Sequence, residues 1–251
     1  MSAVISERAC PSVDSEEAME PTTKRARIEV KPYHGMSLET FTLKNNGKSN
    51  NGVKGGINAF PLIDKEPIRF NLTPGGWLLA PFGFDISGKY ENPSFLSGTP
   101  PEKPGASEGL SLKVNLWADH AEFLRKLDDV AQKAFAELAP DATWKPMVAT
   151  DEERKLASSK VKVVLEGADL TKLAIVKNGV VVRGEGWDFL MGFLAGSGNC
   201  RRAEVKLTVR VKKLWNVAKS AGLSLEATQM VLRIDKPEEE EAFGDDEELL
   251  A

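Results

Sequence analysis

The sequence predicts a mainly β protein, a small β-barrel with one amphipathic helix inserted midway and long loops between strands. Two observations favour this fold class. Short runs of alternating apolar and polar residues recur through residues 31–234, and only one segment has the apolar spacing of a long helix. Residues 1–30 and 235–251 have neither pattern. We therefore expect one folded domain over residues 31–234 between disordered termini.

The first half of the domain is predicted to consist of strands joined by turns and loops. Alternation predicts strands at 37–43 and 68–72, and an apolar run predicts a single strand over 77–86. The Gly/Asn-rich run 45–56 and the Pro/Gly/Ser-rich run 87–109 are predicted surface loops.

The inserted helix follows an alternating strand at 110–117. Asp119 is the predicted N-cap, with Glu122 three residues later, and Pro140 ends a helix that runs to Leu138. Its predicted apolar stripe comprises Phe123, Leu127, Val130, Ala131, Ala134 and Leu138. A polar, partly helical connector is expected at 145–159.

The second half is again rich in strands. Lys177-Asn178-Gly179 between two apolar runs predicts a β-hairpin. The run 203–211 alternates, and its predicted inward residues are Val205, Leu207, Val209 and Val211. The last predicted strand, 223–234, slips in phase between Ala227 and Met230, which indicates a bulge.

Charge is distributed unevenly along the chain. The net charge is −4, but residues 235–251 alone hold nine carboxylates and one lysine, so the rest of the chain is basic. The apolar runs are too short to span a bilayer, and acidic residues interrupt the N-terminus where a signal peptide would be apolar. Cys10 and Cys200 have no Cys or His nearby, which argues against disulfides and zinc sites. We expect a soluble, intracellular protein.

The sequence gives little support for catalysis. His34 and His120 have no nucleophile at motif spacing, and the glycine-rich runs 184–186 and 196–198 do not continue as phosphate-binding loops. Acidic residues of the domain form no metal-like pair. We expect no enzyme activity, no cofactor and no metal.

Basic residues concentrate between Lys160 and Lys219, where twelve Lys or Arg stand against five Asp or Glu. Cations that follow phosphates, with flat rings that stack on bases, are typical of a groove for single-stranded nucleic acid. The predicted phosphate contacts are Lys206, Arg210, Lys212 and Lys213, supported by Lys160 and Lys162, and the predicted stacking rings are Trp215 and Tyr90. Two alternatives stay open: an ordinary solvated strand face, and a core role for Trp215.

The other aromatic residues are predicted to pack. Trp77, Phe82 and Phe84 are assigned mostly to the core, and Trp187, Phe189 and Phe193 to a packing segment that is either helical or extended.

The order of these features resembles a family. An alternating strand, a charged helix, a basic strand at 204–213, a glycine-bearing turn, a last strand and an acidic tail with Phe243 follow one another over residues 109–251. This order is similar to the single-stranded-DNA-binding proteins of short-tailed phages and of large eukaryotic DNA viruses. The resemblance implies an OB-fold and sequence-independent binding of single strands in replication, recombination or repair. It leaves RNA binding and a tail-exchanged homodimer open.

Both termini suggest interactions of their own. The resemblance implies that the tail competes with DNA for the groove and recruits replication or repair proteins, and the predicted competitor residues are Phe243, Glu240, Glu241, Asp245 and Asp246. Near the N-terminus, Lys24, Arg25 and Arg27 form either a nuclear import signal or a chance cluster. An import signal would direct the protein to the nucleus or a viral replication site.

Two rival functions remain open. The acidic tail also suits a β-barrel chaperone or interaction protein for basic partners such as histones, without nucleic-acid binding. A structural virion component is the third interpretation, and it would assemble stably and ignore nucleic acid.

Overall fold

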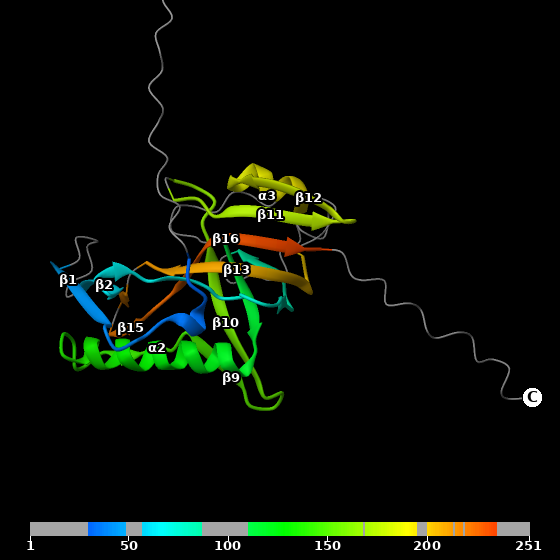
Figure 1. The fold of residues 1–251 in the computed structure, drawn as a ribbon. Coiled ribbons are helices and arrows are strands. Elements are labelled where there is room, and N and C mark those ends of the chain that lie inside the picture. Colours follow the sequence, from blue (N-terminus) through cyan, green and yellow to red (C-terminus); the bar gives the residue numbers. More distant parts are fainter. Residues whose placement is uncertain are drawn as a thin grey trace, which may run out of the picture.

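The structure is a computed structural model that describes residues 30–48, 57–86, 110–167, 169–194, 200–212, 214–217 and 219–234 (Figure 1). The predicted disordered termini and the predicted loop 87–109 lie outside the described residues. In the part of the chain described, no helix is long and apolar enough to cross a membrane.

Strands dominate the described chain. In the first part, a short 3-10 helix η1 (Tyr33–Gly35) precedes β1 (Thr42–Lys48), β2 (Ile57–Ile63), β3 (Glu66–Pro67), β4 (Arg69–Asn71), β5 (Leu78–Ala80), β6 (Phe84–Ile86) and β7 (Leu110–Leu116). Helix α2 (Ala118–Ala136) is followed by β8 (Thr143–Trp144), β9 (Val148–Asp151), β10 (Leu156–Val163), β11 (Lys172–Lys177) and β12 (Val180–Glu185). The last elements are α3 (Gly186–Leu194), β13 (Ala203–Val211), β14 (Trp215–Val217), β15 (Ser220–Gly222) and β16 (Leu225–Arg233).

One large sheet organises the molecule. Its strand order is β12-β11-β16-β10-β7-β6, and β13 pairs along β16 on one side and with β4 and β5 on the other. Strand β16 is central because its first half pairs with β10 and its second half with β11. Two three-stranded sheets, β1-β2-β3 and β14-β15-β8, complete the fold.

The mainly β prediction is confirmed, but the predicted barrel is not closed. Among the described strands, the pairing path ends at β6 on one side and at β4 and β5 on the other, with no ladder that joins them into a ring. The sheet instead branches at β16, because β10 and β11 pair with successive halves of this one strand. The β11–β12 hairpin therefore extends the sheet from β16, beside the barrel-like part (Figure 1).

The prediction of a single helix needs correction. Helix α2 matches the predicted segment and packs against β1, β7, β9 and β10. Residues 186–194, for which the sequence left helix and strand open, form the second helix, α3, beside β12. Gly184 of β12 permits this contact, since a Cβ there would lie 2.3 Å from the Phe189 ring.

The predicted cap and stripe of α2 were also partly wrong. Trp117 is the N-cap and makes no side-chain capping bond, whereas Asp119 lies in the first turn and accepts a hydrogen bond from Tyr33 Oη. The buried stripe centres on Ala121, Leu124 and Leu127, and the predicted Leu138 is exposed.

The second half of the domain follows its patterns closely. The Asn178-Gly179 hairpin joins β11 to β12, and β13 spans the predicted 203–211 with its predicted valines and leucine buried. The predicted bulge is present as a register shift where Thr208 pairs with Gln229 and Val209 with Ala227.

Three predictions in the more irregular parts were wrong. The first strand begins at Thr42 and runs into the predicted loop, to Lys48. The predicted strand 77–86 divides into β5 and β6 at a turn where Gly83 has φ +70°. The expected connector 145–159 lies in a β-hairpin of β9 and β10, in which buried Ser159 and Val161 alternate with exposed Lys160 as the pleat requires.

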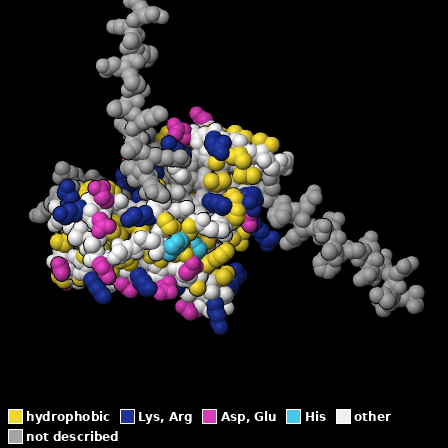
Figure 2. All heavy atoms as spheres, in the orientation of Figure 1, with side chains coloured by type: hydrophobic (Ala, Val, Ile, Leu, Met, Phe, Trp, Pro, Cys, Tyr) yellow, Lys and Arg dark blue, Asp and Glu magenta, His cyan; other side chains and the backbone are white. Residues whose placement is uncertain are grey.

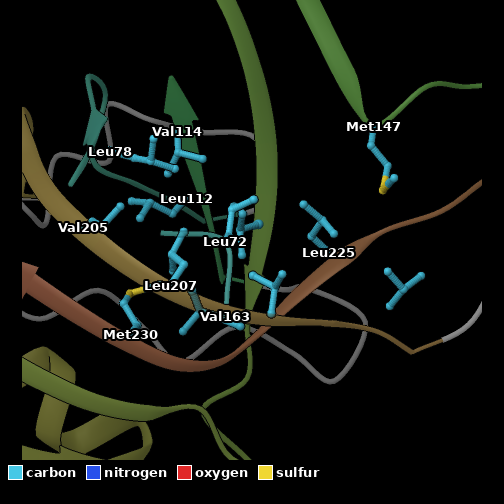
Figure 3. Close-up of a cluster of buried hydrophobic side chains, with 14 of the residues drawn as sticks. Leu72, Leu78, Leu112, Val114, Met147, Val163, Val205, Leu207, Leu225 and Met230 are labelled. Atoms are coloured by element: carbon cyan, nitrogen blue, oxygen red, sulfur yellow. The ribbon is translucent and has the colours of Figure 1, made fainter. Parts of the chain in front are cut away.

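The core lies inside the curved sheet. Figure 3 shows Leu112 and Val114 of β7 pointing toward Val205 and Leu207 of β13 and toward Leu78 of β5. All five are at most 1% exposed, so each contributes on the order of 2 kcal/mol through burial. This core fixes β7, β10, β13 and β16, whose outward residues carry the predicted site.

Candidate nucleic-acid interface

Three predicted site residues meet in one surface groove. Lys160 and Lys162 project from β10, and Trp215 projects from β14, into a groove of about 420 Å³ bounded by residues 110–111, 146–147 and 223–225. We call it the Lys160–Trp215 groove. None of the described residues that line it is a carboxylate, so its charge is positive.

Lys160 is held by a buried counter-ion. Its Nζ lies 2.9 Å from Oδ2 of Asp85 in β6, and the Asp85 side chain is 1% exposed whereas the Lys160 side chain is 57% exposed. The carboxylate therefore holds the ammonium end of the side chain, which remains partly open to solvent. Lys160 is thus a positioned cation whose charge Asp85 partly compensates.

Lys162 has no such partner. It is exposed, and within the described part of the chain it forms no ion pair. The parallel register places it beside Glu226 of β16, but Glu226 is engaged by Arg210 on the opposite neighbour, β13. Lys162 is therefore the freer cation of the groove.

Trp215 is a half-buried ring with a fixed orientation. Its Nε1 donates a hydrogen bond to the Leu223 carbonyl at 3.2 Å, and its ring lies against Gly222, its cross-strand neighbour. A ring held in this way loses little conformational entropy when a ligand stacks on it. The arrangement combines anchoring with partial exposure, so the core role and the stacking role predicted for Trp215 are compatible.

The floor of the groove is tied to α2 through Asp128. The buried Asp128 carboxylate accepts hydrogen bonds from the Met147 backbone N–H at 2.7 Å and from Trp144 Nε1 at 3.3 Å. Burial raises the pKa of Asp128 to about 6, although these two hydrogen bonds oppose the rise. The groove floor thus depends on a carboxyl that titrates near neutral pH.

Asp128→Asn is expected to change how stability depends on pH. Because the folded-state pKa of Asp128 is raised, its protonated form stabilises the fold below pH 4, and this stability is lost as pH rises through about 6. The variant lacks this titration, so its free energy of unfolding relative to the parent should rise by roughly 2–3 kcal/mol between pH 4 and pH 7. Urea unfolding at both pH values measures it, with exposed Asp141→Asn as control. An equal difference at both pH values would contradict the assignment.

Arg210 and Lys212 lie in a charge-compensated cluster. Arg210 donates to Glu226 through its guanidinium, at 3.0 Å from Nε, and also contacts Asp169 at 3.2 Å. Lys212 lies 3.6 Å from Asp169 and 4.0 Å from Glu226. Two cations thus face two carboxylates, and a phosphate would have to compete with both.

Lys206 belongs to a third group. Its Nζ lies 4.7 Å from the Trp77 ring centroid, and Arg233 lies 4.0 Å from the same ring while it pairs with Glu204 at 2.8 Å. The alternating strand β13 therefore separates its predicted cations: Lys206 contacts an aromatic residue, and Arg210 contacts acids.

The remaining predicted residues are not described. Lys213 and Tyr90, the tail residues Glu240, Glu241, Phe243, Asp245 and Asp246, and the basic cluster Lys24, Arg25 and Arg27 all lie outside the described residues. Their roles stay predictions. Among the described residues, no three His, Cys, Asp or Glu side chains gather as a metal site would require.

Sequence reasoning missed three residues near these groups. Trp77, which the sequence predicts mostly as a core residue, is half-buried against two cations, and Trp117 and Arg233 are not among the predicted site residues. The sequence does hold a signal for Trp117. In the alternating strand before it Leu116 takes an inward position, so Trp117 is expected to point outward.

Comparisons with known proteins were made for the whole chain. No protein-family model and no curated protein matches it. A search of solved structures matches the crystal structure of gp2.5, a single-stranded DNA-binding protein encoded by bacteriophage T7, at 10% sequence identity and a TM-score of 0.34. The match covers 74% of this chain and 99% of that chain.

Proposed function

We propose that this protein binds single-stranded DNA, without sequence preference, in the Lys160–Trp215 groove. The observation that carries the proposal is the convergence of Lys160, Lys162 and Trp215, chosen from sequence, in a groove whose described lining has no carboxylate. Lysines hold phosphates of any sequence, and a fixed indole stacks on any base, so this combination suits a strand whose bases are unpaired.

The other predicted cations extend the proposal along β13. Lys212 and Arg210 lie three and five residues before Trp215 in the chain, and Lys206 lies further along the strand. We infer that Lys212 contacts phosphate when Asp169 releases it, and that Arg210 mainly maintains the cluster, because its side chain is only 21% exposed. Lys213 and Tyr90 are proposed as a phosphate contact and a stacking ring.

The biological role we propose is protection of single strands during replication, recombination or repair, at the nucleus or a viral replication site. Replication or repair proteins would bind the acidic tail, and a homodimer would place two grooves in one assembly. The rival proposal is a chaperone for basic proteins such as histones, which the acidic tail alone favours.

A binding assay separates these functions. Single-stranded DNA, duplex DNA, single-stranded RNA and purified histones are each titrated against the full chain by gel shift and fluorescence anisotropy. We expect tight binding to single strands, weaker at high salt by a slope near −0.7 per phosphate contact. Binding to histones with none to oligonucleotide would refute the proposal and favour the chaperone.

Removal of residues 235–251 is expected to tighten binding to oligo-dT at low salt. The segment carries nine carboxylates, and a polyanion tethered to a basic groove competes with DNA at high effective concentration. We expect roughly a tenfold gain at low ionic strength that shrinks as salt screens the tail. Phe243→Ala should produce more of this gain than Glu240→Gln. Equal affinity of the full and truncated chains at low salt would rule out the competition.

A further inference from the structure

Trp117 is unusually exposed for a tryptophan. It follows β7 and exposes 58% of its surface, whereas Trp77, Trp144, Trp187 and Trp215 are all half-buried. Tryptophan is usually well buried because its ring is large and apolar. An indole left in water at the start of α2 therefore suggests a surface that a ligand covers.

The ring of Trp117 is nonetheless held in place. A Cβ on Gly76 would lie 3.5 Å from its Cη2 atom, and His120 meets it edge-on with ring centroids 6.0 Å apart. Together with Tyr33, His34 and Trp77, these residues border a pocket of about 400 Å³, which we call the Trp117 pocket. One face of the Trp117 ring is thus open to a ligand in the Trp117 pocket.

Two cations lie near this pocket through their contacts with Trp77, although neither of them lines it. Trp77 lines it, and Lys206 and Arg233 both lie within 5 Å of the Trp77 ring. Figure 2 shows histidine side chains among hydrophobic and polar atoms on one face, with Lys and Arg side chains on the same face. Because the two cations lie against Trp77, Trp117 offers the freer aromatic face.

We propose that the Trp117 pocket is a second subsite for the bound single strand, in which a base stacks on Trp117 while Lys206 and Arg233 contact its phosphates. This inference rests on the proposed function and adds a site outside the Lys160–Trp215 groove. An aromatic pocket can also hold a methylated ammonium group. Lys206 and Arg233, both within 5 Å of the Trp77 ring, would repel such a ligand.

The test compares variants on an oligo-dT longer than about 16 nucleotides, so that both sites can be filled. Trp117→Ala should lower affinity about tenfold without a change in salt slope, because it removes stacking and no charge. Trp117→Leu should behave alike and Trp117→Phe should retain most of the affinity. Lys206→Gln should instead reduce the salt slope by about 0.7. Leu156→Ala, which removes another exposed apolar side chain, is the control.

An abasic strand of the same length identifies what stacks. On that strand Trp117→Ala should bind as the parent does, since there is no base to lose. If the parent binds oligo-dT and Trp117→Ala binds it equally well, the subsite is wrong and the proposed function stands. If the parent binds no single strand, both fail. If the parent binds a trimethyl-lysine peptide and Trp117→Ala does not, the pocket is a site for a cationic ligand and the proposal of a stacked base is wrong.

Discussion

Gly222→Ala is expected to destabilise the protein by about 3 kcal/mol and to weaken single-strand binding at the same time. A Cβ at this position would lie 2.5 Å from the Lys145 carbonyl oxygen and 2.9 Å from Cζ2 of Trp215. The first of these is a backbone atom, and its segment cannot easily move because the Lys145 N–H donates to the Ala221 carbonyl at 2.8 Å. The substitution must therefore separate β15 from residues 143–145 or displace the indole.

The two consequences can be measured separately. Thermal unfolding should shift by roughly 6–12 °C for a loss of this size in a domain of this length. Affinity for oligo-dT should fall even at temperatures where the variant is folded, because Trp215 no longer lies in its place in the groove. Gly192→Ala is the matched control: nothing lies within 4 Å of its Cβ, and an alanine within α3 should be neutral or stabilising. Unchanged stability of Gly222→Ala would mean that the close contacts are absent in solution.

Regular periodicity explains which elements were predictable. Strand β13 alternates over nine residues and packs on both neighbours, so local pattern and tertiary burial agree and its bounds were found from sequence. The Asn178-Gly179 turn and the β16 bulge were equally local, since each depends on the conformation of two or three residues. The branching of the sheet at β16 was not predictable, because it depends on which distant strands share one edge.

Polar strands were missed for a physical reason. In β10 the buried positions Ser158 and Ser159 carry hydroxyls, and Ser159 satisfies its own by donating to the Met147 carbonyl at 2.9 Å. A hydrogen bond to a residue twelve positions away leaves no trace in hydrophobic periodicity. The same strand carries Lys160 and Lys162; the sequence predicts a strand only from Val161 onward, so its first half was missed.

The sequence predicts the types of residue in the candidate site better than it predicts which of them the fold brings together. The sequence predicts Lys206, Arg210 and Lys212 on one outward face. Strand β13 carries Lys206 and Arg210, and Lys212 follows its end, but the partners that neutralise Arg210 come from residue 169 and from β16. Charge alternation along a strand says nothing of which carboxylates the neighbouring strands supply. For this reason Lys162, predicted only as a supporting contact, emerges as the better candidate.

The double variant Lys162→Glu with Trp215→Ala is expected to bind oligo-dT at least about 100-fold more weakly than the parent. Loss of one stacked base costs about tenfold or more, and Lys162→Glu replaces a phosphate contact by a repulsive charge. Lys162 is the cation to reverse because it forms no ion pair in the described chain. Reversal of Lys160 would instead leave the buried Asp85 carboxylate beside a second carboxylate, and the fold itself would suffer.

The salt dependence of binding distinguishes the contributions of the two substitutions when each is made alone. Lys162→Glu alone should reduce the slope of log K against log salt by about 0.7 or slightly more, whereas Trp215→Ala alone should leave the slope unchanged. Lys126→Glu on the exposed face of α2 changes the net charge equally and is the control for general electrostatics. If Lys126→Glu weakens binding as much as Lys162→Glu does, the strand responds to total charge and the groove is not its binding site. Equal slopes for Lys162→Glu and Trp215→Ala would remove the assignment of Lys162 to phosphate.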